Sequence, residues 1–137
     1  MKIVINKCYG GFGLSNGAML RYLELKGVEF GMYTVQTSPF CYVKLDKSEI
    51  NRDSDCGVTV MLGPQQEMRE YNDDDYFYYA DISRDDPILV QVVEELGSKA
   101  NGVLAELKIV EIPDDVDWYV SDYNGIETVE EIHRTWR

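Results

Sequence analysis

Positive charge is scarce in this chain. Of its 137 residues, 13 are Lys or Arg and 25 are Asp or Glu, which gives a formal net charge of −12. Binding to a nucleic-acid backbone or to an anionic membrane surface needs clustered Lys and Arg. The composition therefore disfavours both, and it favours a partner with a basic surface. The alternative is that the acidity only keeps a small protein soluble.

Cysteine is rare as well. The three cysteines stand at positions 8, 41 and 56, and no Cys-x-x-Cys pair occurs. The odd number and the wide spacing argue against a disulfide framework and against a four-thiolate zinc site. The acidic clusters at residues 73–75, 85–86 and 114–117 do not have EF-hand spacing, so we interpret them as solvated loop charge. We therefore expect neither a metal nor another cofactor.

Long hydrophobic runs are absent too. No stretch of 18 apolar residues occurs, and the first residues do not contain the apolar core of a signal peptide. We expect an intracellular protein that is not inserted in a membrane. A chain of 137 residues is long enough to bury a core without a disulfide or a metal, which predicts a single domain over residues 1–137.

The apolar pattern predicts an α+β fold: a mixed β-sheet with a β-α-β start, two main helices and a C-terminal hairpin. The β-branched run at residues 2–7 is typical of a buried strand. Ser15 or Asn16 is placed to cap a helix that ends at Lys26, and a strand at 28–36 follows closely. The short connection predicts that the first two strands are parallel and joined by a right-handed crossover.

The second half of the chain contains the clearest helix, at residues 87–96, with Asp86 as its cap. Asn124 and Gly125 predict the turn of a β-hairpin. Residues 129–136 fit a helical face and a strand face, and we favour the strand. Further strands are predicted at residues 39–46, 56–62, 76–82 and 104–112, the third of these at a sheet edge.

The glycine-rich loop after the first strand is one candidate site. Backbone N–H groups of such a loop can bind an anion, and a thiol near a helix start can act as a nucleophile with histidine as its base. The spacing fits neither a phosphate loop nor a dinucleotide-binding loop, and a purely structural turn is the alternative. The residues of this candidate site are Lys7, Cys8, Gly10, Gly11, Gly13, His133 and Arg134.

The second candidate site is the tract YNDDDYFYY at residues 71–79, where carboxylates alternate with flat rings. A basic groove that binds nucleic acid recognises negative charge and stacked rings, so this tract has the features of an imitation of nucleic acid. Tyrosine is also enriched at protein interfaces. The alternative is an edge strand preceded by a polar loop. The predicted partner-binding residues are Asp73, Asp74, Asp75, Tyr76, Tyr78 and Tyr79.

Several motifs together resemble a family of small bacteriophage and prophage proteins. The resemblance rests on NKCYGGFGLS at residues 6–15, on the unit from 85 to 116 with its LKIVEIPDDV strand, and on HRTW at 133–136. It covers both ends and the helix–strand unit, whereas residues 28–82 do not share it. The resemblance implies a counter-defence role in the host cytoplasm, and anti-CRISPR inhibition of a Cas9-type nuclease is one form of that role.

Three hypotheses about function follow. The leading one is a non-enzymatic protein that inhibits a host defence protein by imitating nucleic acid at its basic groove. The second is a sponge that sequesters a nucleotide immune signal in the glycine-rich loop, with Lys7 and Arg134 neutralising phosphate, at an interface of a homo-oligomer. The third is an enzyme that uses Cys8 and His133.

Overall fold

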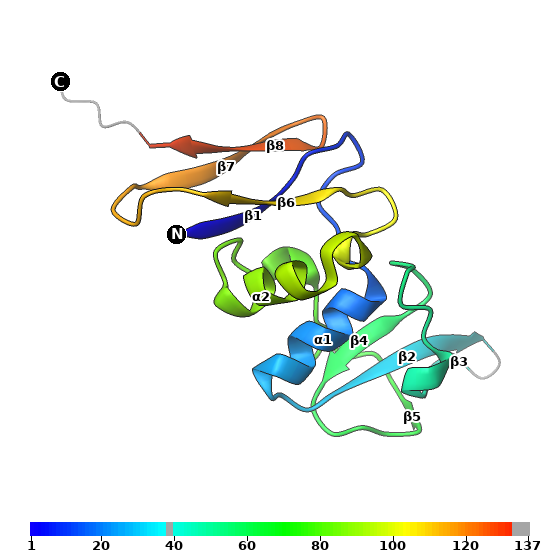
Figure 1. The fold of residues 1–137 in the computed structure, drawn as a ribbon. Helices are drawn as coiled ribbons and strands as arrows, with labels where there is room; N and C mark the ends of the chain where they lie inside the picture. The colour runs from blue at the N-terminus through cyan, green and yellow to red at the C-terminus, as the bar shows by residue number, and fades with distance from the viewer. Residues whose placement is uncertain (38–39, 133–137) are drawn as a thin grey trace.

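The computed structural model of the chain describes residues 1–37 and 40–132 (Figure 1). Its helices are α1 (Asn16–Lys26) and α2 (Pro87–Leu96), and its short 3-10 turns are η1 (Lys47–Glu49), η2 (Tyr79–Asp81) and η3 (Gly97–Ala100). The strands are β1 (Lys2–Asn6), β2 (Phe30–Thr37), β3 (Phe40–Lys44), β4 (Thr59–Leu62), β5 (Met68–Arg69), β6 (Leu107–Glu111), β7 (Trp118–Tyr123) and β8 (Ile126–Glu131).

The strands form three antiparallel sheets. β1 pairs with β6, the order in the second sheet is β4-β2-β3-β5, and β7 and β8 form a hairpin. Figure 1 shows the four-stranded sheet with α1 at one end of the molecule and β1, β6, β7 and β8 at the other, with α2 between them. The predicted α+β class, the two helices and the C-terminal hairpin are confirmed.

The predicted parallel crossover is wrong, and so is the single mixed sheet. Strand, helix and strand follow one another as expected, but β1 pairs with β6 and β2 pairs with β3 and β4, all antiparallel. The reason is the position of the helices. α1 and α2 pack on each other between the two sheets, so β1 and β2 are separated by a layer of helix and cannot hydrogen-bond.

The ends of both helices follow from the sequence. Ser15 Oγ accepts a hydrogen bond from Ala18 N at 3.1 Å, and Gly27 ends α1 in the left-handed region with φ 73°. Asp86 Oδ1 accepts from Ile88 N at 2.8 Å and so caps α2, as predicted. One set of buried apolar side chains joins both ends of the molecule. It includes Val4 of β1, Leu89 of α2, Leu20 of α1 and Met32 of β2.

A buried ion pair fastens β8 to the rest of the fold. Glu127 is 5% exposed, and its two carboxylate oxygens lie 2.5 and 2.8 Å from the two terminal nitrogens of Arg84. Glu127 also accepts from Asn6 N at 2.8 Å, and the Arg84 guanidinium lies 3.6 Å from the centre of the Phe12 ring. A guanidinium held between a carboxylate and a ring thus joins three distant parts of the chain.

Residues 76–82 do not form the predicted edge strand. Tyr76 makes one isolated antiparallel bridge with Met61, and the chain then turns into η2. Phe77 points inward and stacks on Tyr22 with ring centres 6.0 Å apart, and Ile82 is buried. These two inward side chains tie the segment to the core at both ends of the turn and prevent regular pairing.

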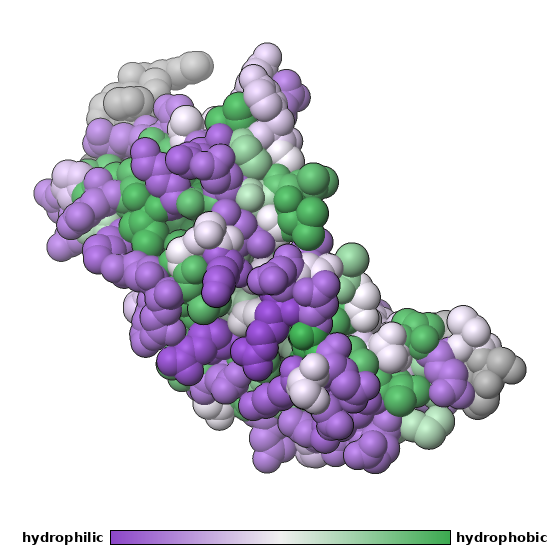
Figure 2. Space-filling model, turned by 45° about the vertical axis from the view of Figure 1, so that its right-hand side comes forward, coloured by the Kyte–Doolittle hydropathy of each residue, from purple (hydrophilic) through white to green (hydrophobic). Residues whose placement is uncertain are grey.

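The C-terminal strand β8 ends at Glu131, so the predicted strand is confirmed over its first three residues. Its remainder from 133 onward lies outside the described residues. Within residues 1–37 and 40–132, no helix is both long enough and apolar enough to cross a bilayer. Figure 2 shows hydrophilic residues over much of the face in view, with hydrophobic residues in separate patches between them.

Candidate functional site

Five tyrosines lie in a row of neighbouring rings, which we call the tyrosine row. The ring centres are 5.9 Å apart from Tyr42 to Tyr71, 5.8 Å from Tyr71 to Tyr76 and 6.4 Å from Tyr76 to Tyr78. Tyr78 and Tyr79 are 5.0 Å apart. The side chains of Tyr71, Tyr76 and Tyr78 are 43–45% exposed, so the middle of the row presents rings to solvent. The structure thus brings together the three predicted tyrosines and adds Tyr42 and Tyr71.

A tight turn over residues 72–76 brings two rings of the tyrosine row together. Asn72 Oδ1 accepts from Asp74 N at 3.0 Å, and the Asn72 carbonyl accepts from the backbone N–H groups of Asp75 and Tyr76, both at 3.1 Å. An asparagine that bonds its own backbone two residues on is typical of such turns. The turn reverses the chain and so places the ring of Tyr76 next to that of Tyr71.

The three predicted aspartates do not act as one free acidic patch. Asp73 and Asp74 are exposed, whereas Asp75 is half-buried and lies 2.8 Å from Arg69 Nη2. One of the three carboxylates is therefore paired with a basic group within the protein. Asp73 has a local effect of its own: its hydrogen bond to the Tyr71 hydroxyl raises the pKa of Tyr71 to about 12.

Of the hollows that border the tyrosine row, two are lined by both Tyr76 and Tyr78. The first, which we call the Asp55 pocket, has a volume of about 70 Å³. Four aromatic residues, three apolar residues and one carboxylate line it: Tyr76, Phe77, Tyr78 and Tyr79, then Met19, Val58 and Val60, and Asp55. Burial raises the pKa of Tyr79, and the neighbouring Tyr78 and Asp55 raise it further, so its hydroxyl stays neutral.

The second hollow, the Asp81 pocket, has a volume of about 230 Å³ and shares Tyr76, Phe77 and Tyr78 with the first. The Tyr22 hydroxyl donates to Asp86 Oδ2 at 2.7 Å, and burial together with Asp86 raises the pKa of Tyr22. Lys26 is already present here, with Nζ 5.5 Å from the centre of the Tyr22 ring. This pocket therefore holds a cation of its own beside its carboxylates.

Asp55 and Asp81 are the functional candidates that sequence reasoning missed. Asp55 lies in a polar loop about twenty residues before the tyrosines, and no motif connects it with them. Asp81 follows the tract directly and could have been found as part of the same acidic run. Only the fold brings Asp55 to the rings.

The glycine-rich loop is a tightly packed turn in this structure. A Cβ on Gly10 would lie 1.7 Å from the Leu104 carbonyl oxygen, so only glycine fits there. Gly11 has φ 86°, and the Gly13 carbonyl accepts from Gly102 N at 2.9 Å. These contacts agree with the structural alternative for the loop.

The start of α1 has no donor left for an anion. Asn16 N donates to the Ser54 carbonyl at 2.7 Å, Gly17 N to the Arg52 carbonyl at 3.1 Å, and Ala18 N to the Ser15 side chain. Lys7, the predicted phosphate ligand, pairs with Glu106 at 3.2 Å. Its predicted partner Arg134 lies outside the described residues. These contacts occupy the first donors of α1 and the Lys7 side chain, and the nucleotide-sponge hypothesis stays an alternative for the N–H groups of the loop itself.

The thiol of Cys8 contacts the end of β1 and the loop before β6. Its Sγ lies 3.0 Å from the Leu104 carbonyl oxygen and 3.4 Å from Asn6 Oδ1, so the single thiol proton has two acceptors within reach. Its predicted base His133 lies outside the described residues. Elsewhere, within the parts of the chain that the structure describes, no group of three or more His, Cys, Asp or Glu side chains could hold a metal ion.

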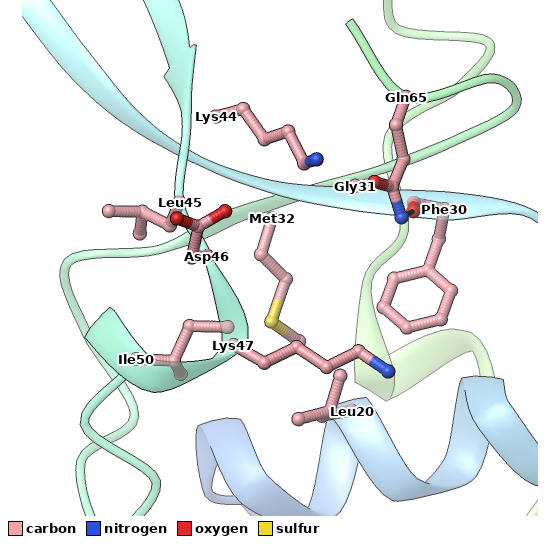
Figure 3. A pocket seen from close by; sticks show the side chains of 10 residues that line it. All are labelled: Leu20, Phe30, Gly31, Met32, Lys44, Leu45, Asp46, Lys47, Ile50 and Gln65. Carbon is pink, nitrogen blue, oxygen red and sulfur yellow. Dashed lines mark hydrogen bonds between the residues drawn. The ribbon is translucent and has the colours of Figure 1, made fainter. Parts of the chain in front are cut away.

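A further pocket of about 210 Å³ lies between α1 and the four-stranded sheet (Figure 3). Its floor is apolar, with Leu20, Met32 and Phe30, and the Lys47 side chain extends across it. Lys44 also lines it but lies on the opposite face of β2 from Met32, because it pairs with Tyr33 in the sheet. The two lysines do not converge on one point, so this pocket does not have the form of a phosphate site.

Comparison of the chain with protein-family models, with curated proteins and with solved structures gave no match.

Proposed function

We propose that this chain is a non-enzymatic counter-defence protein that docks on the basic, nucleic-acid-binding surface of a host defence protein and blocks it. The tyrosine row is the observation that supports this proposal. It presents three exposed rings, and it has Asp73 and Asp74 on the turn beside it. The role against host defence is taken from the resemblance of the motifs to those of bacteriophage proteins. A Cas9-type nuclease is one host defence protein with a basic, nucleic-acid-binding surface.

The chemistry of the row fits a basic partner. Arginine and lysine side chains bind to the faces of aromatic rings and pair with carboxylates, and tyrosine contributes large contact area at protein interfaces. A groove that normally holds nucleic acid offers such side chains in a line. The formal net charge of −12 adds a long-range attraction that speeds the encounter at low salt.

Charge reversal at the turn tests this proposal. Asp73→Lys with Asp74→Lys changes two exposed carboxylates that form no ion pair with residues 1–37 or 40–132. It spares Asp75, which pairs with Arg69. We expect the double variant to capture its partner from host lysate at least tenfold more weakly, because its new lysines face the basic groups of the partner. A loss of this size is roughly that of one interface hot spot. The partner's own nucleic acid should compete with the wild-type chain.

The matched control is Asp115→Lys with Asp117→Lys. It changes the net charge by the same amount at exposed positions before β7, far along the chain from the row. The control should capture the same partner as the wild-type chain. Equal capture by the Asp73/Asp74 variant, or a partner that binds nucleic acid and inhibitor at once, would refute the proposal.

A further inference from the structure

The Asp55 pocket combines aromatic faces with one carboxylate. The rings of Tyr76 and Tyr78 are nearly parallel, at 12° to each other, with centres 6.4 Å apart. The ring of Tyr79 is tilted against that of Tyr78 by 54° and closes another side. Such a set of rings offers negatively polarised faces in several directions, and a cation within about 6 Å of a ring centre is attracted to them.

The carboxylate of this pocket is held in place and keeps one oxygen free. Asp55 Oδ2 accepts from Val103 N at 3.0 Å, and Oδ1 has no hydrogen-bond partner among residues 1–37 and 40–132. None of the described residues that line this pocket is Lys or Arg, in contrast to the Asp81 pocket with its Lys26. The Asp55 pocket is therefore an acidic, aromatic site, and no described residue of its lining carries a positive charge that would balance the carboxylate.

Its size selects the kind of ligand. The volume of about 70 Å³ is several times the ~10–15 Å³ that one water needs, and it is far below the ~300–1,000 Å³ of typical small-molecule pockets. A site of this size takes the end of one side chain rather than a nucleotide or a cofactor.

The chain contains filled versions of the same arrangement. The Arg84 guanidinium lies over the Phe12 ring and pairs with Glu127 through two hydrogen bonds. The Arg69 guanidinium lies 5.8 Å from the centre of the Tyr33 ring and pairs with Asp75. In both places a planar guanidinium contacts an aromatic side chain and pairs with a carboxylate.

We infer that the Asp55 pocket receives the guanidinium of an arginine side chain of the partner, stacked on the rings of Tyr76 and Tyr78 and paired with Asp55. This inference rests on the proposed function, because it names the chemical group by which the tyrosine row recognises a basic surface. Arginine is favoured over lysine because its flat group stacks on rings and pairs with a carboxylate at the same time.

Binding of blocked amino acids tests the inference directly. N-acetyl-arginine methylamide is titrated into the protein while the methyl signals of the methionines are followed by NMR. Met19 lines the pocket and Met32 does not, so the Met19 methyl should move and the Met32 methyl should stay. The citrulline analogue has the same shape without the charge, and we expect it to bind at least fivefold more weakly. Equal binding of citrulline or of the lysine analogue would overturn the assignment.

Two pairs of variants complete the test. Asp55→Asn keeps an oxygen for the bond from Val103 and removes the charge, and Asp53→Asn on the same exposed loop is its control. Tyr78→Leu removes one ring face, and Tyr119→Leu, a similarly exposed tyrosine on β7, is its control. The first member of each pair should weaken arginine binding about five- to tenfold, and the controls should leave it unchanged. Unchanged binding in Asp55→Asn and Tyr78→Leu would refute the site.

The same variants separate this inference from the proposed function. If Asp55→Asn loses arginine binding but captures the host partner as well as the wild-type chain does, the pocket exists and the partner does not use it, which overturns the inference alone. If Asp55→Asn loses both, the inference is supported. If no nucleic-acid-binding partner is captured while the arginine titration depends on Asp55, the proposed function fails and the arginine site stands.

Discussion

Two regions of this molecule combine aromatic rings with a carboxylate, and they differ in whether a guanidinium of the chain lies with them. Around Arg84, a guanidinium, the Phe12 ring and the Glu127 carboxylate are buried together and join β1, β8 and the segment before α2. Around Asp55, rings and a carboxylate lie at the surface, and none of the described residues that line this pocket is an arginine. The first arrangement joins distant parts of the fold, and the second is the site that we propose for an arginine of another molecule. Burial decides which role the same chemistry has.

The comparison predicts its largest effect at the buried pair. Glu127→Ala leaves the Arg84 charge with little solvent and no carboxylate, so we expect a loss of about 3–5 kcal/mol in the free energy of unfolding, measured by urea denaturation. Replacing both partners, Arg84→Met with Glu127→Leu, should cost less than Glu127→Ala alone because no charge stays buried. A double variant with a lower free energy of unfolding than Glu127→Ala would contradict this explanation, because the loss would then not come from the unpaired Arg84 charge.

The ion pair of Arg69 and Asp75 is intermediate in burial between the Arg84–Glu127 pair and the exposed Asp55 pocket. Its arginine side chain is 10% exposed and its aspartate side chain is 39% exposed. Asp75→Asn should lower the free energy of unfolding by about 1–2 kcal/mol, since a charged hydrogen bond is lost at a partly solvated place. Asp74→Asn is the control on the same turn and should be neutral in the same urea titration. Equal stabilities of the two variants would mean that the ion pair contributes nothing to the turn.

At the tyrosine row we expect substitutions to change partner binding more than the free energy of unfolding, the opposite of what we expect at the buried ion pair. Tyr78→Ala removes a 45% exposed ring, so the free energy of unfolding should change by only about 0.5 kcal/mol. Capture of the partner should weaken about tenfold or more, as for an interface hot spot. Tyr123→Ala, at a more exposed tyrosine of the β7–β8 hairpin, is the control for both measurements. Strong destabilisation with unchanged capture would show that the row is structural.

The sequence predicted what depends on neighbouring residues. Both helices, the Ser15 and Asp86 caps and the turn at Asn124 and Gly125 depend on residues a few positions apart, and all of them are found in the structure. The pairing of β1 with β6 joins residues about a hundred positions apart. No periodicity encodes such a pairing, because it depends on how α1 and α2 pack between the sheets.

The candidate site shows the same division. The rings of Tyr76, Tyr78 and Tyr79 were found because they are adjacent in the chain. Neither the neutralisation of Asp75 by Arg69 nor the approach of Asp55 was predicted, since both depend on contacts across loops. A cluster of like charges in a sequence therefore overstates the free charge at the surface, because some of its members pair inside the fold.

The smallest predicted effect concerns the proton on Tyr71. Its hydrogen bond to Asp73 raises the pKa of Tyr71 to about 12, above the value of about 10 in the unfolded chain. A raised pKa means that the neutral hydroxyl is favoured by folding. This contribution to stability is fully present below pH 10 and is lost as the pH rises towards 12. Asp73→Ala should shift the phenolate titration of Tyr71, followed by NMR of labelled tyrosine ring carbons, towards pH 10, whereas Asp74→Ala should leave it in place. A Tyr71 titration that is unchanged in Asp73→Ala would show that the neighbouring tyrosines, and not this carboxylate, keep the Tyr71 hydroxyl protonated.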